Sequence, residues 1–132
     1  MNTSDTPTAR DTAETIRLFN DAFKRRDKDA LAALVHEECL MVSAQPSPDG
    51  TAYVGKEACV AFWAEMLDDE STTFEVHHVF VHGDWAAVRW RYRFGPSDAE
   101  SVLGVNVTRV SDGRVIEQLG YTKAPGGLPL PE

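Results

Sequence analysis

Residues 72–94 read TTFEVHHVFVHGDWAAVRWRYRF, with side-chain character alternating on both sides of Gly83-Asp84. A period of two is typical of β-strands, and a Gly-Asp pair between two such runs predicts a hairpin. A second run of this kind reads SVLGVNVTRVSDGRVIEQLGYT over residues 101–122 and turns at residues 111–113. The chain therefore predicts four long strands in two consecutive hairpins.

Upstream of the hairpins the apolar residues follow helical spacing. A first helix is predicted over residues 11–26 and a shorter one over residues 27–35, each opened by a capping Asp. Residues 39–44 predict a short strand, residues 45–50 a loop, and a third helix begins at residues 55–56. Helices early and strands late indicate an α+β fold. We expect a cone, in which three helices wrap a strongly curved antiparallel sheet around a cavity that suits a small ligand.

Composition limits the classes of function. The chain has 132 residues, a net charge of −8 and a pI near 4.9, and it is 42% hydrophobic and 26% charged. One domain over residues 11–124 is expected, between a mobile arm (1–10) and a Pro/Gly-rich tail (125–132). An acidic surface repels phosphates, so no nucleic-acid or membrane partner is expected. Without a signal peptide or a membrane-spanning run, the expected location is cytoplasmic.

The cysteines and histidines predict neither a disulfide nor a metal site. Cys39 and Cys59 lie among apolar residues and are expected to be buried, reduced thiols. His78 and His82 share a strand face, but four residues separate them by about 13 Å, too far to bind one ion. No carboxylate or cysteine completes a ligand set with His77, so we expect no metal and no cofactor.

Three segments resemble the nuclear transport factor 2-like superfamily, and most closely its SnoaL-like and ketosteroid isomerase-like branch. They are GKEACVAFW (55–63), HGDWAAVRW (82–90) and GVNVTRVSDGRVIEQLGY (104–121). The resemblance covers about residues 12–123 and implies a curved sheet wrapped by three helices. It also implies a homodimer through the outer face of the sheet. Function varies widely within this superfamily, so the fold does not settle the chemistry.

The catalytic sets that the resemblance implies are not matched. Ketosteroid isomerases use a general-base Asp where this chain has Ser43, and an oxyanion hole where it has Phe19 and Asn106. Because Ser43 cannot accept a carbon-bound proton, steroid isomerisation by that mechanism is not expected. The epoxide hydrolase-like positions hold Trp90, Tyr92 and Gly120, and the polyketide cyclase-like positions hold Gln118 and Gly120.

The alternation of side chains between the two faces of each strand predicts which residues point into the interior. The resemblance places Trp90 and Tyr92 inward, and residues two apart share a face. A two-residue turn in the first hairpin then pairs His77 with Trp90 and makes His77 the inward histidine, whereas a bulge would exchange it for His78.

A three-residue loop in the second hairpin sets Asn106 opposite Gln118. Buried amides must be hydrogen-bonded, so these two would bond each other, water or a ligand.

We therefore predict His77, Tyr92 and Asn106 as the polar groups of a catalytic site, with His77 as the acid–base group. Each has an alternative structural role, and Trp63 lies on an apolar helical stripe that is typical of core packing. The predicted ligand-binding residues are Phe19, Tyr53, Trp63, Trp90 and Gln118.

Two classes of function fit these residues. The first is binding of a small apolar organic molecule, coupled to a cofactor-independent isomerisation, cyclisation, hydration or hydrolysis. The second is a non-catalytic ligand-binding or dimerisation module on the same fold. An acid or base side chain that faces the interior would favour the catalytic function, and its absence would favour the non-catalytic module. A protein-transport adaptor is a third interpretation, and only the fold supports it.

Overall fold

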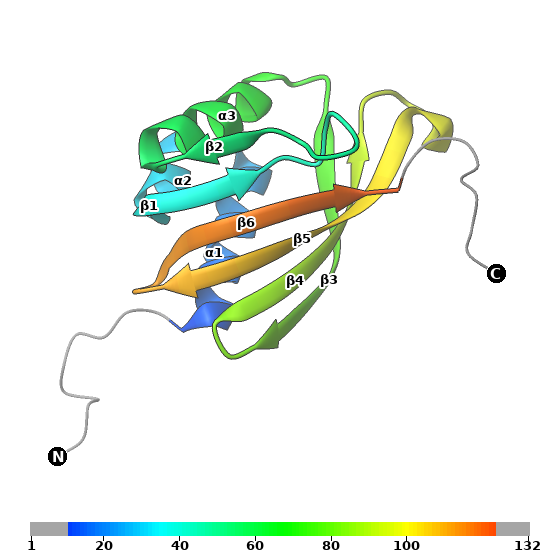
Figure 1. Ribbon diagram of the computed structural model, residues 1–132. Helices are drawn as coiled ribbons and strands as arrows, with labels where there is room; N and C mark the ends of the chain where they lie inside the picture. The colour runs from blue at the N-terminus through cyan, green and yellow to red at the C-terminus, as the bar shows by residue number, and fades with distance from the viewer. Residues whose placement is uncertain (1–10, 124–132) are drawn as a thin grey trace, which may run out of the picture.

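The computed structural model describes residues 11–123, so the predicted arm and tail lie outside the described residues. Three α-helices, a short 3-10 helix and six strands follow one another along the chain (Figure 1). The elements are α1 (Thr12–Arg25), α2 (Lys28–Ala33), β1 (Val35–Val42), β2 (Ala52–Val54), α3 (Lys56–Asp68), β3 (Thr73–His82), β4 (Trp85–Arg93), η2 (Asp98–Glu100), β5 (Ser101–Ser111) and β6 (Arg114–Thr122).

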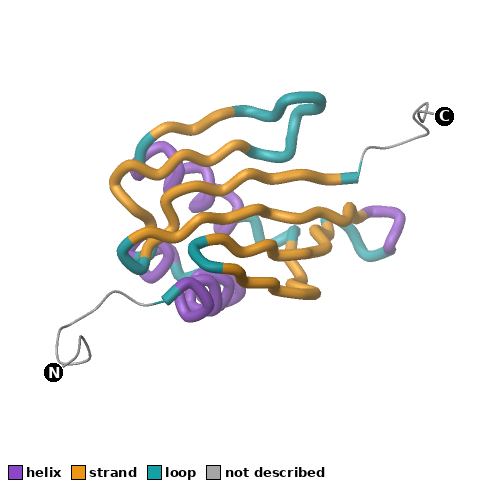
Figure 2. Tube along the Cα trace, turned by 60° about the horizontal axis from the view of Figure 1, so that its bottom comes forward, coloured by secondary structure: helices purple, strands orange, loops and turns teal. Residues whose placement is uncertain are grey.

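The six strands form one curved sheet in the order β2-β1-β6-β5-β4-β3, with the three α-helices on one side of it (Figures 1 and 2). Adjacent strands run antiparallel except for β1 and β6, which are parallel. The predicted α+β cone is confirmed, and its sheet is antiparallel apart from the one parallel pair of β1 with β6. No turn joins β1 to β6, so local sequence carries no signal for their relative direction.

The helix boundaries follow the predicted caps. Asp11 accepts a hydrogen bond from the Glu14 backbone N–H at 2.8 Å, and Asp27 accepts one from Ala30 at 3.0 Å. These bonds satisfy N–H groups that have no partner within the helix. The short strand differs from its prediction, because β1 begins at Val35 rather than at residue 39. A further short strand, β2, precedes α3 and contains Tyr53.

Two register shifts change which residues face each other in the hairpins. In the first hairpin His82 pairs with Trp85 as predicted, but an irregularity between Val76 and His78 sets Val76, rather than His77, opposite Trp90. His77 is the extra residue of a β-bulge, which reverses the alternation on one side of it.

The second hairpin has a two-residue turn instead of the predicted three-residue loop. Asp112 and Gly113 both have positive φ angles, 55° and 71°, which match the twist of the flanking strands. A second shift, between Arg109 and Val110, sets Thr108 opposite Gln118 and Asn106 opposite Gly120. The predicted pairing of Asn106 with Gln118 was therefore wrong.

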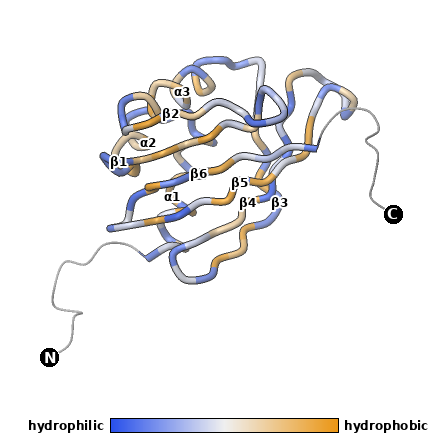
Figure 3. Tube along the Cα trace, in the orientation of Figure 1, coloured by the Kyte–Doolittle hydropathy of each residue, from blue (hydrophilic) through white to orange (hydrophobic). Residues whose placement is uncertain are grey.

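The core lies between the helices and the sheet, in two adjoining clusters. One joins the three helices to β1 and β6 through Leu31, Cys39, Trp63, Val115 and their neighbours. The other joins Ile16 of α1 to β4 and β5. Hydrophobic and hydrophilic residues alternate along the strands (Figure 3), as expected where one face packs on helices and the other does not. No helix within residues 11–123 is long and apolar enough to cross a bilayer.

Candidate functional site

The sheet has an inner face, which packs against the helices, and an outer face, which the helices leave uncovered (Figure 2). Strand pairing and alternation assign residues to each face. None of the inner-face side chains on β4, β5 and β6 is charged. They are Ala86, Val88, Trp90, Tyr92, Val102, Gly104, Asn106, Thr108, Val110, Val115, Gln118, Gly120 and Thr122.

Aromatic rings form a continuous chain across the interior. The chain begins at Trp63 of α3, whose ring centroid lies 5.2 Å from that of Phe19, and passes through Phe23 to Phe74. Phe74 contacts Trp90 at 5.1 Å and Tyr92 at 4.7 Å. Each pair is tilted or edge-on, which is the favourable arrangement of aromatic quadrupoles. Phe19, Trp63, Trp90 and Tyr92 are candidate site residues from the sequence, whereas Phe23 and Phe74 join them only in the structure.

Trp90 is central to this arrangement. Its side chain is 6% exposed, and its Nε1 is a buried donor with no hydrogen-bond partner within residues 11–123. The indole lies directly over Gly104, because a Cβ on that glycine would come within 2.4 Å of the ring. A strand glycine here leaves space for the large ring.

The amides of the inner face have different surroundings. Gln118 donates to the Thr108 hydroxyl at 3.3 Å, and both residues are buried. Asn106 lies beside Gly120, since a Cβ on that glycine would be 3.2 Å from Asn106 Oδ1. Among the described residues, no side-chain hydrogen bond of Asn106 is present. The Gln118 amide is thus used in a hydrogen bond within the core, whereas the Asn106 amide is available to a ligand.

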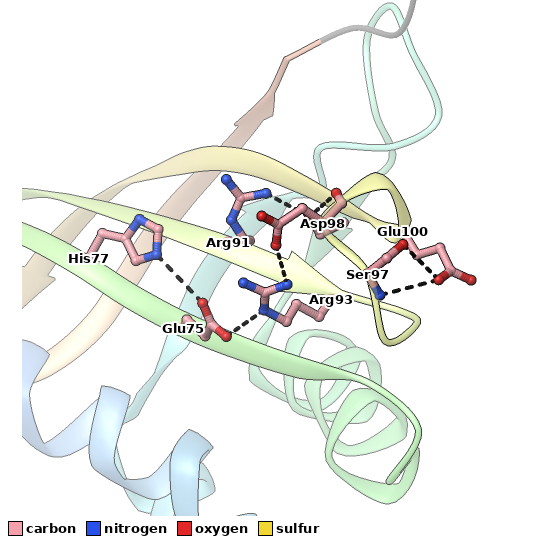
Figure 4. Close-up of polar contacts among 8 residues, drawn as sticks. Glu75, His77, Arg91, Arg93, Ser97, Asp98 and Glu100 are labelled. Atoms are coloured by element: carbon pink, nitrogen blue, oxygen red, sulfur yellow. Dashed lines mark hydrogen bonds and ion pairs between the residues drawn. The ribbon is translucent and has the colours of Figure 1, made fainter.

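His77 does not face the interior, which corrects its predicted orientation. Its Nε2 lies 3.7 Å from Glu75 Oε1 (Figure 4). Glu75 is the strand neighbour of Arg91 across β3 and β4, and both residues belong to the outer face. Arg93 donates to Glu75 and to Asp98 of η2. The Arg93 hydrogen bonds hold the pKa values of both carboxyl groups below their ordinary range. His77 therefore belongs to a polar cluster outside the cone.

His78, the alternative histidine, also lies on the outer face, where its Nδ1 is 3.0 Å from an Arg89 nitrogen. The inner face of the four long strands thus contains no imidazole and no carboxylate among the described residues.

The cysteines are the buried, reduced thiols that the sequence predicts. Cys59 Sγ donates to the Tyr53 carbonyl at 3.4 Å, which ties α3 to β2. Burial raises the pKa of both thiols, so they are neutral. Tyr53 packs on Phe62 with a centroid separation of 4.8 Å, near the α3 end of the interior.

Two hollows of the described surface lie away from the aromatic chain. One of about 570 Å³ is lined by Asp11, Thr12 and Asp84, where α1 begins beside the hairpin turns. Another of about 400 Å³ is lined by Ala32, Lys56 and Val60. Aromatic rings pack against one another across the interior, and neither of these hollows lies there. The interior cavity therefore stays a prediction. Within residues 11–123, no group of His, Cys, Asp or Glu side chains is arranged to bind a metal ion.

A curved sheet wrapped by three helices around an uncharged, aromatic interior defines a nuclear transport factor 2-like cone. The SnoaL-like domain model matches residues 16–118, and the chain belongs to that family.

Solved structures agree with this assignment. An NTF2-like protein of unknown function from Mesorhizobium loti is 41% identical, with 94% of this chain and 96% of that chain covered and a TM-score of 0.79. A candidate polyketide cyclase from Sinorhizobium meliloti is 21% identical over 91% and 99% of the two chains, with a TM-score of 0.67. A candidate ketosteroid isomerase from Kribbella flavida is 21% identical over 91% and 83%, with a TM-score of 0.75. The last two similarities concern the fold alone. No curated protein matches the chain.

Proposed function

We propose that this protein binds a small, neutral, largely apolar organic molecule between α1, α3 and the inner face of the sheet. The observation that carries this proposal is the uncharged inner face, lined by the rings of Phe74, Trp90 and Tyr92. Aromatic rings give a flat apolar molecule a large contact area. A charged ligand would lose its hydration without gaining an ion-pair partner.

Ligand entry requires the aromatic side chains to move. Tyr92 is half-buried and Phe94, which contacts it at a centroid distance of 6.1 Å, is 50% exposed. These two rings lie at the least covered end of the aromatic chain. We expect them to change rotamer on binding, while Trp63 and Phe19 stay in place in the core.

Binding is tested with three naphthalenes of similar size, namely 2-isopropenylnaphthalene, 2-acetonaphthone and the anion 2-naphthoate. We expect the two neutral compounds to bind with dissociation constants of about 1 mM or tighter, and the anion at least about tenfold more weakly. Protein-detected NMR should place the shifts at Tyr92, Asn106 and the residues around them. The proposal is wrong if neither these compounds nor a panel of neutral terpenoids and steroids binds, or if the shifts map to the outer face.

An isomerase or cyclase activity is the second candidate, favoured by family membership and by the names of two structural relatives. The inner face offers Tyr92 and Asn106 as hydrogen-bond donors. It offers no carboxylate or imidazole base among the described residues, which is why we propose binding first.

Exchange of the methyl protons of 2-acetonaphthone in D2O, followed by NMR, tests this second candidate. Catalysis predicts faster exchange with the wild-type protein and a loss of that rate in Tyr92→Phe. Exchange at the buffer rate would leave binding as the function.

We also propose that two copies associate through the outer face. Apolar residues cross that face from β2 to β3, and Val54, Phe80 and Tyr121 are each more than half exposed. A second copy of the same face would cover them.

A further inference from the structure

We propose that the dimer formed through the outer face weakens on acidification, and that protonation of His78 is the cause. This inference rests on the proposed dimer and names the group that regulates it. It depends on three features of the outer face: the place of His78 beside an apolar stripe, its hydrogen bond with Arg89, and the pairing of the carboxylates around it.

The first feature is the position of His78 at the border of an apolar stripe. One residue from each of five strands forms this stripe across the outer face, each paired with the next, namely Phe80, Ala87, Val107, Leu119 and Val42. His78 and Arg89 are the next outer-face pair along β3 and β4. The His78 ring also stacks on Phe80, with centroids 5.9 Å apart. A second copy that covers the stripe would therefore cover His78 as well.

The second feature is the hydrogen bond between His78 and Arg89. The Nδ1 atom of His78 lies 3.0 Å from Nη1 of Arg89. A guanidinium has only donors, so the imidazole nitrogen is the acceptor. That nitrogen has a free lone pair only when it carries no proton, so this arrangement requires a neutral ring. Protonation of Nδ1 would replace the hydrogen bond with a contact between two cations.

The third feature is that the carboxylates around His78 already have partners. The charged and titratable groups of β3 to β6 on this face, with those just beyond the strands, are Glu75, His77, His82, Arg89, Arg91, Arg93, Asp98, Arg109, Glu117, Tyr121 and Lys123. Arg93 donates to Glu75 and Asp98, and Arg109 donates to Glu117. Arg89 forms no ion pair with a carboxylate among residues 11–123. A positive charge on His78 would therefore be added to a cationic part of the face.

These features make association depend on pH. In the monomer His78 and Arg89 are exposed, so water solvates a proton added to the imidazole. In the dimer the same charge would lose its hydration beside Arg89, and two-fold symmetry would repeat this cost in the second copy. The monomer therefore binds protons more readily than the dimer. By linkage, the dimer becomes weaker as the pH falls through the range in which imidazoles gain a proton.

The net charge of the chain predicts the opposite direction. Each copy carries a charge of −8 at pH 7, and acidification reduces that charge and with it the repulsion between copies. A dimer controlled by net charge would become tighter at lower pH. The direction of the change therefore distinguishes a local effect at His78 from a general one.

The test measures the dissociation constant of the dimer by sedimentation equilibrium at about pH 8 and about pH 6, at one ionic strength. For the wild-type protein we expect the constant to be at least about tenfold higher at the lower pH. His78→Gln keeps a neutral acceptor for Arg89 and cannot be protonated, so its constant should change by less than about twofold. His77→Gln is the matched control, because it removes the adjacent imidazole, whose charge Glu75 would compensate. It should retain the tenfold change.

The outcomes separate the inference from the dimer on which it rests. Circular dichroism at both pH values confirms that each variant is folded before its association is compared. If the wild-type protein dimerises equally or more tightly at the lower pH, or if His78→Gln keeps the pH dependence, the role of His78 is wrong while the dimer stands. If the wild-type protein is monomeric at both pH values, the dimer and the inference are both wrong.

Discussion

Gly104 decides where the Trp90 ring can lie. The glycine faces inward on β5, and the space above its Cα is filled by the benzo edge of the indole. The backbone of Gly104 does not itself require a glycine, because Gly104 is not among the residues with a positive φ angle. The lack of a side chain, rather than backbone freedom, is what this position requires.

Gly104→Ala tests this requirement. A Cβ would lie 2.4 Å from the indole and 2.6 Å from the Tyr121 carbonyl, so the ring or the β6 backbone must shift. We expect a loss of about 1–3 kcal/mol in the free energy of unfolding, measured by urea denaturation. Gly55→Ala has an open space for the new Cβ but a φ of 95°, so its cost would come from backbone strain alone. An unchanged stability in Gly104→Ala would show that the ring is free to move.

The candidate site was only partly predictable at the residue scale. The family resemblance placed Trp90 and Tyr92 inward, and the structure sets Asn106 on the same face because no bulge interrupts the pairing of β4 with β5. His77 and the partner of Asn106 were misassigned, because each inference counted residues across a bulge. A single extra residue reverses the facing of a strand, and neither bulge has a glycine that would mark it.

At the scale of the elements, Arg26 joins the ends of two helices. It ends α1 in a left-handed conformation with a φ of 57°. Its guanidinium donates to the carbonyls of Leu67, Asp69 and Thr72, which follow or end α3. One side chain thus satisfies carbonyls at the end of α3, which the helix leaves without helical partners, and the Thr72 carbonyl just before β3.

Arg26→Met should destabilise the protein by about 2 kcal/mol, because hydrogen bonds from a charged donor are lost while the aliphatic stem remains. Thermal unfolding followed by circular dichroism would measure it. Lys28→Met is the matched control, since it removes one exposed ion pair with Asp68 and should change stability little. Equal effects of the two changes would contradict a bridging role for Arg26.

The polar cluster outside the cone makes the stability depend on pH. The hydrogen bonds from Arg93 lower the pKa of Glu75 and of Asp98 from ordinary values of 4.5 and 3.8. A lowered pKa contributes stability above the ordinary value, and that contribution is lost as the pH falls through the folded-state value.

We therefore expect Arg93→Gln to lower the melting temperature at pH 6, and we expect this effect to shrink as the pH falls below the ordinary carboxyl values and through the lowered folded-state pKa values. Differential scanning calorimetry at several pH values measures the difference between variant and wild type. A difference that stays constant over this range would show that the cluster contributes through packing instead of charge.

For the whole molecule, local signals were enough to predict the α+β cone. Caps at Asp11 and Asp27 and the turn at Gly83-Asp84 fixed two helix starts and one hairpin. Contacts between distant segments could not be predicted. The parallel pairing of β1 with β6 and the packing of Phe23 on Phe74 join segments with no turn between them.

The proposed dimer is tested on the outer face. Light scattering should give a mass of about twice 14.6 kDa for the wild type. Tyr121→Glu places a charge in the middle of the outer face and should give the monomer mass. Phe94→Glu changes an equally exposed aromatic residue away from that face and should leave the mass unchanged. A wild-type protein that stays at 14.6 kDa at every concentration would exclude the dimer.

The bulge at His77 has a consequence for solubility. β3 is an edge strand ten residues long, and it exposes Val76, Val79, Phe80 and Val81. A straight apolar edge of that length would be a template for intermolecular strand pairing and aggregation. The extra residue interrupts the row of backbone donors and acceptors, and it sets an imidazole beside a carboxylate at the interruption. Deleting His77 would straighten the edge, and the protein would then be expected to form fibrils more readily.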